Sequence, residues 1–319
     1  MRLHSLGQKT ISVLRRNVTA TLACLAISFL SGCGDVQPSD LYYPGPPVVK
    51  PVLFRFAVFG DAEPKPDPDF ENLSAAVDAV NELSRILPID FVASVGDIAH
   101  QGKEVQYQMA TSEIERLEAP FYAIMGNEEF GGGLALFKEY AAKWNDDPDL
   151  IPGPSYSFAH KGVQFVFAGP DAGGRDFTNE GVEWILSEFE KVSDASIVLF
   201  THVPAPDTFP DGKNRSISNP EFSRVLSHPR LAVVFSGHLH LNLDDRIHIV
   251  ESNGVLHVHV PGLERTKVGR RHVPRFRLVT VFADGDVLLE TFNVSAGEFE
   301  DDHFDLFPQL VSGPTFEHK

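Results

Sequence analysis

Side chains of the types that bind metal ions follow five short apolar segments of this 319-residue chain. Each segment has the length and composition of a buried strand. In most cases a glycine precedes the polar residue, which permits a tight exit of the backbone there. The candidate residues are Asp61, Glu63, Asp97, His100, Asn127, Glu128, His202, His238 and His240.

The chemistry of these side chains predicts a transition-metal site. In open α/β sheets, ligands collect in the crevice at the carboxyl ends of the strands, so five strand ends would direct these groups to one place. His238 and His240 are separated by one residue and would point the same way on an extended chain. Carboxylate and imidazole together suit Mn, Fe or Zn and are too rich in nitrogen for a typical calcium site.

The elements that must position these residues alternate between strand and helix over the first two thirds of the chain. The last third has the patterns and turns of β-structure. A single α/β domain with two packed sheets is therefore expected over residues 52–297. Strands are expected at 52–59, 91–95, 121–125, 156–158, 163–167, 197–200, 231–235, 248–250, 255–260, 275–282 and 287–294, and helices at 70–87, 104–117, 134–144 and 181–192.

The order of the motifs resembles the calcineurin-like metallophosphoesterase superfamily. The resemblance rests on Gly-Asp at 60–61 and 96–97, Gly-Asn at 126–127, His202 and Gly-His-Leu-His at 237–240, and it covers roughly residues 52–294. It implies a four-layer α/β/β/α sandwich in a single domain. It also implies two divalent or trivalent transition-metal ions, Mn, Fe or Zn, as cofactors.

The resemblance also implies a reaction, the hydrolysis of a phosphate mono- or diester. Both metals would hold phosphate oxygens, and a metal-bound water of lowered pKa would attack phosphorus. Asp97, Glu128 and His202 are the residues expected to take part in catalysis. The alternative is a catalytically weakened relative that serves as a metal- or ligand-binding module. Position by position, the ligands implied are Asp61 and His240 for the first metal, Asn127, His202 and His238 for the second, and Asp97 for both.

The first motif departs from the family pattern, Asp-x-His, at Glu63. A Glu carboxylate can also bind a transition metal. Purple acid phosphatases, a branch of the superfamily, likewise lack this His and have a Tyr three residues after the bridging Asp. That position is His100 in this chain. Either His100 or Glu63 is therefore expected to complete the first metal's ligands, and we favour His100.

The third motif, usually Gly-Asn-His-Glu, has Glu128 in place of the His that is thought to protonate the leaving group. A Glu carboxyl has an ordinary pKa of about 4.3, and nearby dications lower it further. Glu128 is therefore expected to be ionised and a poor general acid. General acid catalysis contributes about 10²–10⁴-fold, so esters with poor leaving groups should react slowly. Glu129 matches the family's own Glu and is expected to have a structural role.

Residues 1–32 have the pattern of a lipoprotein signal peptide. Four basic residues and no acidic residue accompany the apolar run 18–30, which is too short to span a bilayer. The run ends in Leu-Ser-Gly-Cys, which resembles a bacterial lipoprotein signal with the lipid anchor on Cys33. An ordinary signal peptide and twin-arginine export at Arg15-Arg16 are the alternatives. The proline-rich residues 33–51 are expected to form a tether.

These features predict a protein of the cell envelope, on the periplasmic or outer-membrane face or on the extracellular face of the plasma membrane. The net charge is −17, and removal of residues 1–32 takes it to about −21. Nucleic acid is therefore not expected as a general partner. Residues 298–319 are expected to form a solvated acidic C-terminal tail. A basic cluster is expected to be an exposed loop that pairs with acids: Arg265, Lys267, Arg270, Arg271, Arg275 and Arg277.

Overall fold

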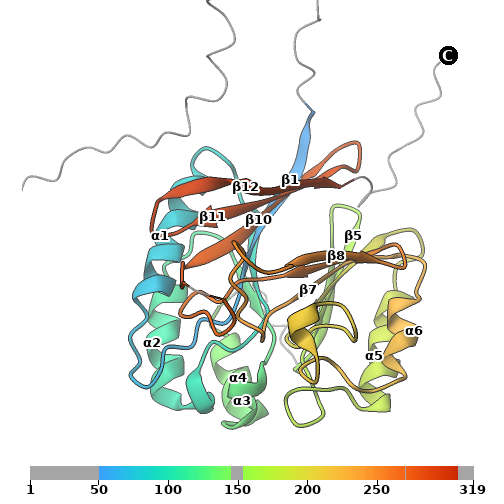
Figure 1. The fold of residues 1–319 in the computed structure, drawn as a ribbon, viewed down its shortest axis with the longest axis horizontal. Helices are drawn as coiled ribbons and strands as arrows, with labels where there is room; N and C mark the ends of the chain where they lie inside the picture. Colours follow the sequence, from blue (N-terminus) through green and yellow to red (C-terminus); the bar gives the residue numbers. More distant parts are fainter. Residues whose placement is uncertain (1–49, 145–153, 270, 308–319) are drawn as a thin grey trace, which may run out of the picture. The chain divides into compact units, whose positions relative to one another are not determined.

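Two six-stranded sheets lie face to face in the computed structural model, which describes residues 50–144, 154–269 and 271–307 (Figure 1). The first sheet has the order β12 (Glu298–Phe307), β11 (Val287–Asn293), β10 (Arg275–Phe282), β1 (Val52–Phe59), β2 (Phe91–Ser94), β3 (Phe121–Ala123). The second has the order β4 (Tyr156–His160), β5 (Val163–Ala168), β6 (Ser196–Thr201), β7 (Leu231–Ser236), β9 (Val255–His259), β8 (Ile249–Ser252).

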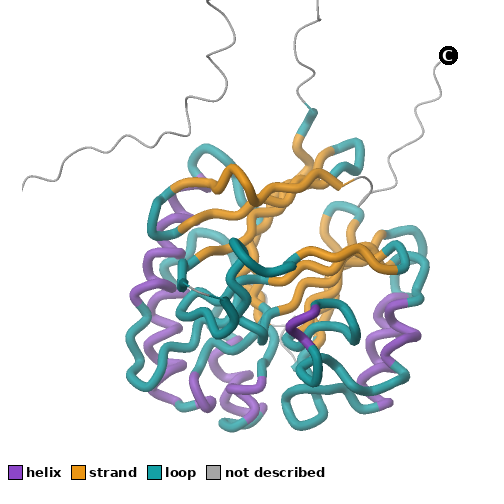
Figure 2. Tube along the Cα trace, viewed as in Figure 1, coloured by secondary structure: helices purple, strands orange, loops and turns teal. Residues whose placement is uncertain are grey.

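Helices cover the outer faces of both sheets, as the purple and orange segments of Figure 2 show. The strands that lead to the site residues are parallel within each sheet: β1, β2 and β3 in the first, and β5, β6, β7 and β9 in the second. The helices are α1 (Glu71–Ser84), α2 (Glu104–Ile114), α3 (Asn127–Phe130), α4 (Leu134–Ala141), α5 (Asn179–Phe189) and α6 (Phe222–Leu226).

Three apolar cores separate four layers. In β1, Phe56 and Val58 face the second sheet, whereas Ala57 and Phe59 face the helices α1 and α2. The central strands of the second sheet, β5, β6, β7 and β9, are likewise buried on both faces, and the face turned away from the first sheet packs against α5 and α6. Burial on both faces explains why these strands are continuous apolar runs rather than alternating ones. The predicted α/β/β/α sandwich is confirmed.

The predicted acidic tail is wrong over residues 298–307, which form strand β12 at the edge of the first sheet. The strand pairs with β11 in antiparallel register. Phe299 packs on Phe292 with ring centroids 5.2 Å apart, and this contact supplies apolar burial that the acidic composition conceals. Residues 308–319 lie outside the described part of the chain.

The predicted basic cluster is not a single exposed loop. Arg275 and Arg277 are buried in β10. Arg275 pairs with Asp244 and with Glu300. The guanidinium of Arg277 donates to the carbonyl O of His259. The expected strand at 275–282 therefore accounts for these two arginines, and their partners come from other parts of the sequence.

The predicted signal peptide at 1–32 lies outside the described residues, as does the predicted tether at 33–51 apart from its last two residues. Within the residues that the structure describes, no helix has both the length and the apolar character needed to cross a membrane.

Candidate metal centre

The carboxyl ends of five parallel strands from the two sheets bring the predicted site residues together. Asp61 follows β1, Asp97 follows β2 and Asn127 follows β3, while His202 follows β6 and His238 follows β7. All of them are buried or partly buried. The carboxyl ends of these strands therefore meet at one crevice, which holds these side chains.

One group of four donors contains the residues implied for the first metal. Asp61, Glu63, Asp97 and His240 place ligand atoms within 4.8 Å of one another, and all four side chains are buried. His240 Nε2 lies 3.1 Å from Asp61 Oδ1 and 3.9 Å from Glu63 Oε1. His240 Nδ1 lies 3.0 Å from the carbonyl O of Arg265. Because a carbonyl only accepts, Nδ1 carries a hydrogen, and Nε2 faces the carboxylates.

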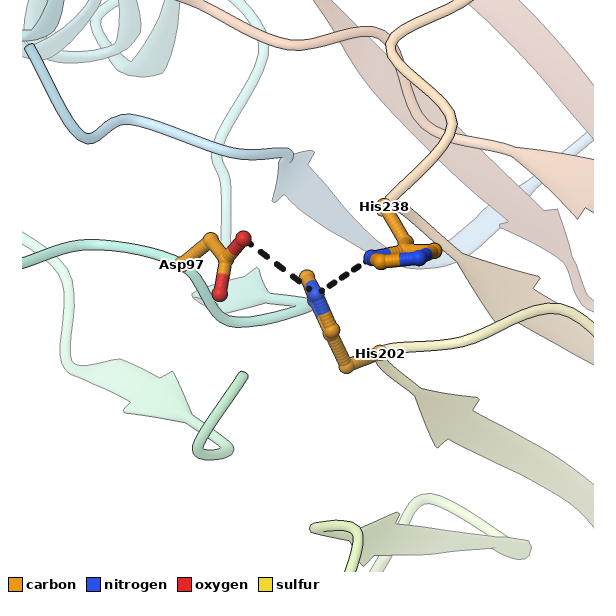
Figure 3. Close-up of side chains that lie close together, drawn as sticks. All are labelled: Asp97, His202 and His238. Atoms are coloured by element: carbon orange, nitrogen blue, oxygen red, sulfur yellow. Dashed lines mark hydrogen bonds and ion pairs between the residues drawn. The ribbon is translucent and has the colours of Figure 1, made fainter. Parts of the chain in front are cut away.

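A second group of three donors contains Asp97, His202 and His238 (Figure 3). His202 Nε2 lies 3.4 Å from Asp97 Oδ2 and 3.3 Å from His238 Nδ1. Asn127 Oδ1 also lies 3.3 Å from His202 Nε2. His202 Nδ1 lies 2.9 Å from the carbonyl O of Val95, which directs Nε2 into the site. The two groups share Asp97, so one carboxylate faces both.

Buried polar atoms in both groups fit a bound cation. Asp97 Oδ2, Glu63 Oε2 and His240 Nε2 are buried and form no hydrogen bond with the described residues. An unpaired buried polar atom costs about 1–3 kcal/mol, and a charged one costs more. Buried ligand atoms that converge on one place without a hydrogen bond are compatible with bound metal ions. The mixed carboxylate, amide and imidazole set suits Mn, Fe or Zn.

The backbone at the site is held in conformations that L-residues rarely adopt. The angle φ is 54° at Asp97, 66° at His238 and 51° at His240. Such conformations cost about 1–3 kcal/mol each and persist only where the surroundings impose them. The turn at Gly126 is equally constrained, because a Cβ there would lie 2.2 Å from Asp97 Oδ1. This contact is the reason for glycine before Asn127.

Glu129 fixes the loop that carries Asp97. Its buried carboxylate accepts hydrogen bonds from the backbone N–H groups of Asp97 at 2.9 Å, Ile98 at 2.5 Å, Ala99 at 2.6 Å and Gly126 at 2.7 Å. One side chain thus joins the turn after β2 to the turn after β3. The structural role expected for Glu129 agrees with this geometry.

Glu63, rather than His100, lies in the first donor group. Oε1 of Glu63 pairs with Arg265, and Oε2 is the buried atom without a hydrogen-bond partner. Burial, together with the nearby Asp97 and Asp61, raises the pKa of Glu63 well above its usual range. His100 belongs to neither group, since its Nδ1 lies 2.8 Å from Glu128 Oε2. The preference for His100 as a ligand stays a prediction, and the His100 ring turns toward Glu128.

Both carboxylate oxygens of Glu128 form hydrogen bonds or ion pairs with neighbouring residues. Lys65 Nζ pairs with Oε1, and Oε2 accepts from the backbone N–H of Gln101 at 3.0 Å in addition to its contact with His100. Burial opposes ionisation, but these donors outweigh it and lower the pKa of Glu128 to about 2. Glu128 is therefore ionised at neutral pH and cannot supply a proton. Lys65, which the sequence analysis did not single out, also lies 3.6 Å from Glu63 Oε1.

The histidines of the second group have opposite pKa shifts. Burial disfavours the charged form of His202, but the carboxylates of Asp97 and Asp61 outweigh burial and raise its pKa to about 10. Burial and the neighbouring His202 lower the pKa of His238 to about 2. A metal ion must therefore displace a proton from His202 when it binds.

A pocket of ≈ 350 Å³ opens beside the second group. Two sets of residues line it: Asn127, Glu128 and His238 of the site, and the basic residues Arg175, Arg215 and Lys267. Arg215 Nη2 donates to the carbonyl O of His238 at 3.0 Å, which places the guanidinium next to the site. Sequence reasoning missed Arg175 and Arg215, because both lie in loops without a motif.

A family model described as calcineurin-like phosphoesterase matches residues 33–242, more than half of the chain. The protein belongs to the calcineurin-like phosphoesterase family. Family membership implies a dinuclear metal site, and the two buried groups that share Asp97 are compatible with one.

A curated relative matches part of this chain. The probable glycerophosphodiester phosphodiesterase GpdQ of Arcobacter nitrofigilis is 27% identical over 118 residues, which cover 36% of this chain and 42% of the relative. The chain therefore aligns with less than half the length of this curated relative.

Two solved structures share the fold. The purple acid phosphatase PPD1 of yellow lupin (Lupinus luteus) has a TM-score of 0.59 at 16% identity, covering 80% of this chain and 54% of that chain. GAP50, the anchor in the inner membrane complex of Plasmodium, has a TM-score of 0.54 at 14% identity, covering 80% of this chain and 88% of that chain. The match to the phosphatase spans little more than half of its length. At these identities, the likeness shows the fold alone.

Replacing Glu129 by Gln tests how the Asp97 loop is held. The amide would place an NH₂ group against backbone N–H donors, so buried donors lose their acceptor. We expect Glu129→Gln to lower the free energy of unfolding by at least ~2 kcal/mol and to weaken metal binding about 10–100-fold. Thermal unfolding and metal analysis measure both effects. Glu115→Gln, at an exposed site, is the control. Unchanged unfolding and metal content in Glu129→Gln would contradict this account.

Proposed function

We propose that the protein hydrolyses phosphate mono- or diesters with two transition-metal ions. The observation that carries the proposal is that two buried donor groups share Asp97. When bound, the metals supply Lewis acidity at the phosphate oxygens and lower the pKa of the attacking water. The ligands proposed are Asp61, Glu63 and His240 for the first metal, Asn127, His202 and His238 for the second, and Asp97 for both.

The protein's own contribution is to hold these donors in place before any ion or substrate arrives. The carbonyl groups of Arg265 and Val95 orient the rings of His240 and His202. Glu129 holds the Asp97 loop through backbone hydrogen bonds. Such support keeps ligating atoms in a productive geometry and limits the reorganisation that the reaction requires.

Glu128 has a positioning role in this proposal. Its carboxylate holds Lys65 and His100 beside the site, and both can donate hydrogen bonds. Lys65 lies between Glu63 and Glu128, so its ammonium adds positive charge where a phosphate would bind. Glu128 itself remains ionised, so its carboxylate accepts hydrogen bonds and has no proton to donate.

A panel of phosphate esters tests the proposal directly. Protein reconstituted with Mn, Fe or Zn should hydrolyse at least one of 4-nitrophenyl phosphate, bis(4-nitrophenyl) phosphate and a glycerophosphodiester, the last chosen because of the GpdQ relative. Chelation should abolish the activity and added metal should restore it. Asp97→Asn should lower kcat/KM at least ~100-fold, because it weakens the shared ligand. The exposed-site variant Glu115→Gln should retain full activity.

The second candidate is a binding module that keeps the fold and the metals without efficient catalysis. Glu128 favours it, since this residue supplies no proton to a leaving group. One neighbour of the same fold, GAP50, is described as an anchor in a membrane complex. Two bound metals with no turnover of any ester in the panel, whichever metal is supplied, would favour the binding module over the hydrolase.

Leaving-group dependence tests the part played by Glu128. Without a proton donor at this position, the enzyme should cleave phenyl phosphate much faster than an alkyl ester such as glycerol phosphate. Glu128→His introduces a group that can donate a proton, so it should raise kcat/KM for the alkyl ester by up to about 10²-fold and change phenyl phosphate less. Equal rates for the two esters in the wild-type protein would refute this role.

A further inference from the structure

Three cationic side chains beside the metal centre have no carboxylate partner among the described residues. Arg175, Arg215 and Lys267 line the pocket that also contains Asn127 and His238. None of the three lies within ion-pair distance of a described carboxylate, and Arg215 bonds only to a backbone carbonyl. Most other surface cations near the site are paired, as Arg265 is with Glu63 and Lys65 with Glu128.

The two carboxylates of the pocket lining are already satisfied within the protein. Both oxygens of Glu128 are bound by Lys65 and His100. Asp176 accepts hydrogen bonds from the backbone N–H groups of Ser218 and Asn219, at 3.2 Å each. Neither carboxylate forms an ion pair with the three cations, so positive side chains outnumber negative ones in the described lining of the pocket.

Positive charge at this place contrasts with the rest of the molecule. The chain carries a net charge of −17, which repels anions at long range. Arg175, Arg215 and Lys267 line one pocket, and none of them forms an ion pair with a described carboxylate. Such a cluster of cations is explained by an anionic ligand, because a local positive pocket in an acidic protein concentrates anions.

We propose that this pocket binds a second anionic group on the substrate, so that the preferred substrates are phosphate esters whose organic part carries its own carboxylate or phosphate. The proposal rests on the proposed function, since the metal centre would hold the first phosphate. The planar guanidinium groups of Arg175 and Arg215 suit two-point binding of a carboxylate or phosphate. The side chain of Lys267 adds a third positive charge.

Binding of phosphonates that cannot be hydrolysed tests the proposal independently of turnover. The affinity of the metal-loaded protein is measured by calorimetry for 4-carboxybenzylphosphonate and for its neutral isostere, 4-carbamoylbenzylphosphonate. We expect the carboxylate to bind at least about 10-fold more tightly, which corresponds to ~1.4 kcal/mol. A third ligand, 1,4-xylylenediphosphonate, shows whether the pocket prefers a phosphate-like group to a carboxylate.

Arg175→Gln is the decisive variant, because the Arg175 side chain is exposed and its loss should leave the fold intact. The variant should reduce the preference for the carboxylate to less than about threefold. Lys213→Gln is the matched control, since Lys213 is exposed and lines a neighbouring pocket instead. Circular dichroism checks that each variant is folded.

Three results would overturn the proposal: equal affinities for the two ligands in the wild-type protein, a preference that survives Arg175→Gln, or no binding of either ligand. Hydrolysis of phenyl phosphate is measured on the same samples. A protein that prefers the carboxylate ligand but hydrolyses nothing would refute the proposed function and leave the anion pocket in place. A protein that hydrolyses phenyl phosphate but does not prefer the carboxylate ligand would refute the anion pocket and leave the proposed function in place.

Discussion

Asp97 presents a single carboxylate to two sets of donors, and contacts from the surrounding loops hold it in that position. Its backbone has a φ of 54°, and its N–H is held by Glu129. Its Oδ1 accepts from the backbone N–H of Glu128 at 2.8 Å, and its Oδ2 lies 3.4 Å from His202 Nε2. Gly126 lies so close that no side chain fits there. The turns after β2 and β3 therefore form one unit, and a change in either moves the shared ligand.

This arrangement concentrates negative charge in a buried place. Asp61, Glu63, Asp97 and Glu129 are all buried within two adjoining turns and the end of β1. Like charges at close range in a medium of low dielectric repel strongly, so the fold needs compensation. Glu129 is compensated by backbone N–H groups and Glu63 in part by Arg265. Asp61 and Asp97 face imidazoles, and metal ions would supply the remaining positive charge.

The sequence predicted the parts of this site that depend on strand order. Asp61, Asp97 and His202 each follow an apolar run, and the strand-end rule is enough to bring them together. The sequence favoured His100 over Glu63 as a ligand, because the contact between His100 and Glu128 in space cannot be predicted from the motif. Strand β12 was not predicted because its many acidic residues are typical of solvated surface, although the segment pairs with β11 at the edge of the sheet. Arg175 and Arg215 lie in loops whose position only the packed fold determines.

In the proposed metal centre one carboxylate, that of Asp97, joins two metal ions. Electron paramagnetic resonance of the manganese-loaded protein, together with its metal content, measures whether the ions are joined. We expect two Mn²⁺ per chain with the spectrum of an exchange-coupled pair in the wild-type protein, and loss of that coupling in Asp97→Ala. Two manganese ions with the spectrum of isolated ions in the wild-type protein, or coupling that persists in Asp97→Ala, would contradict this proposal.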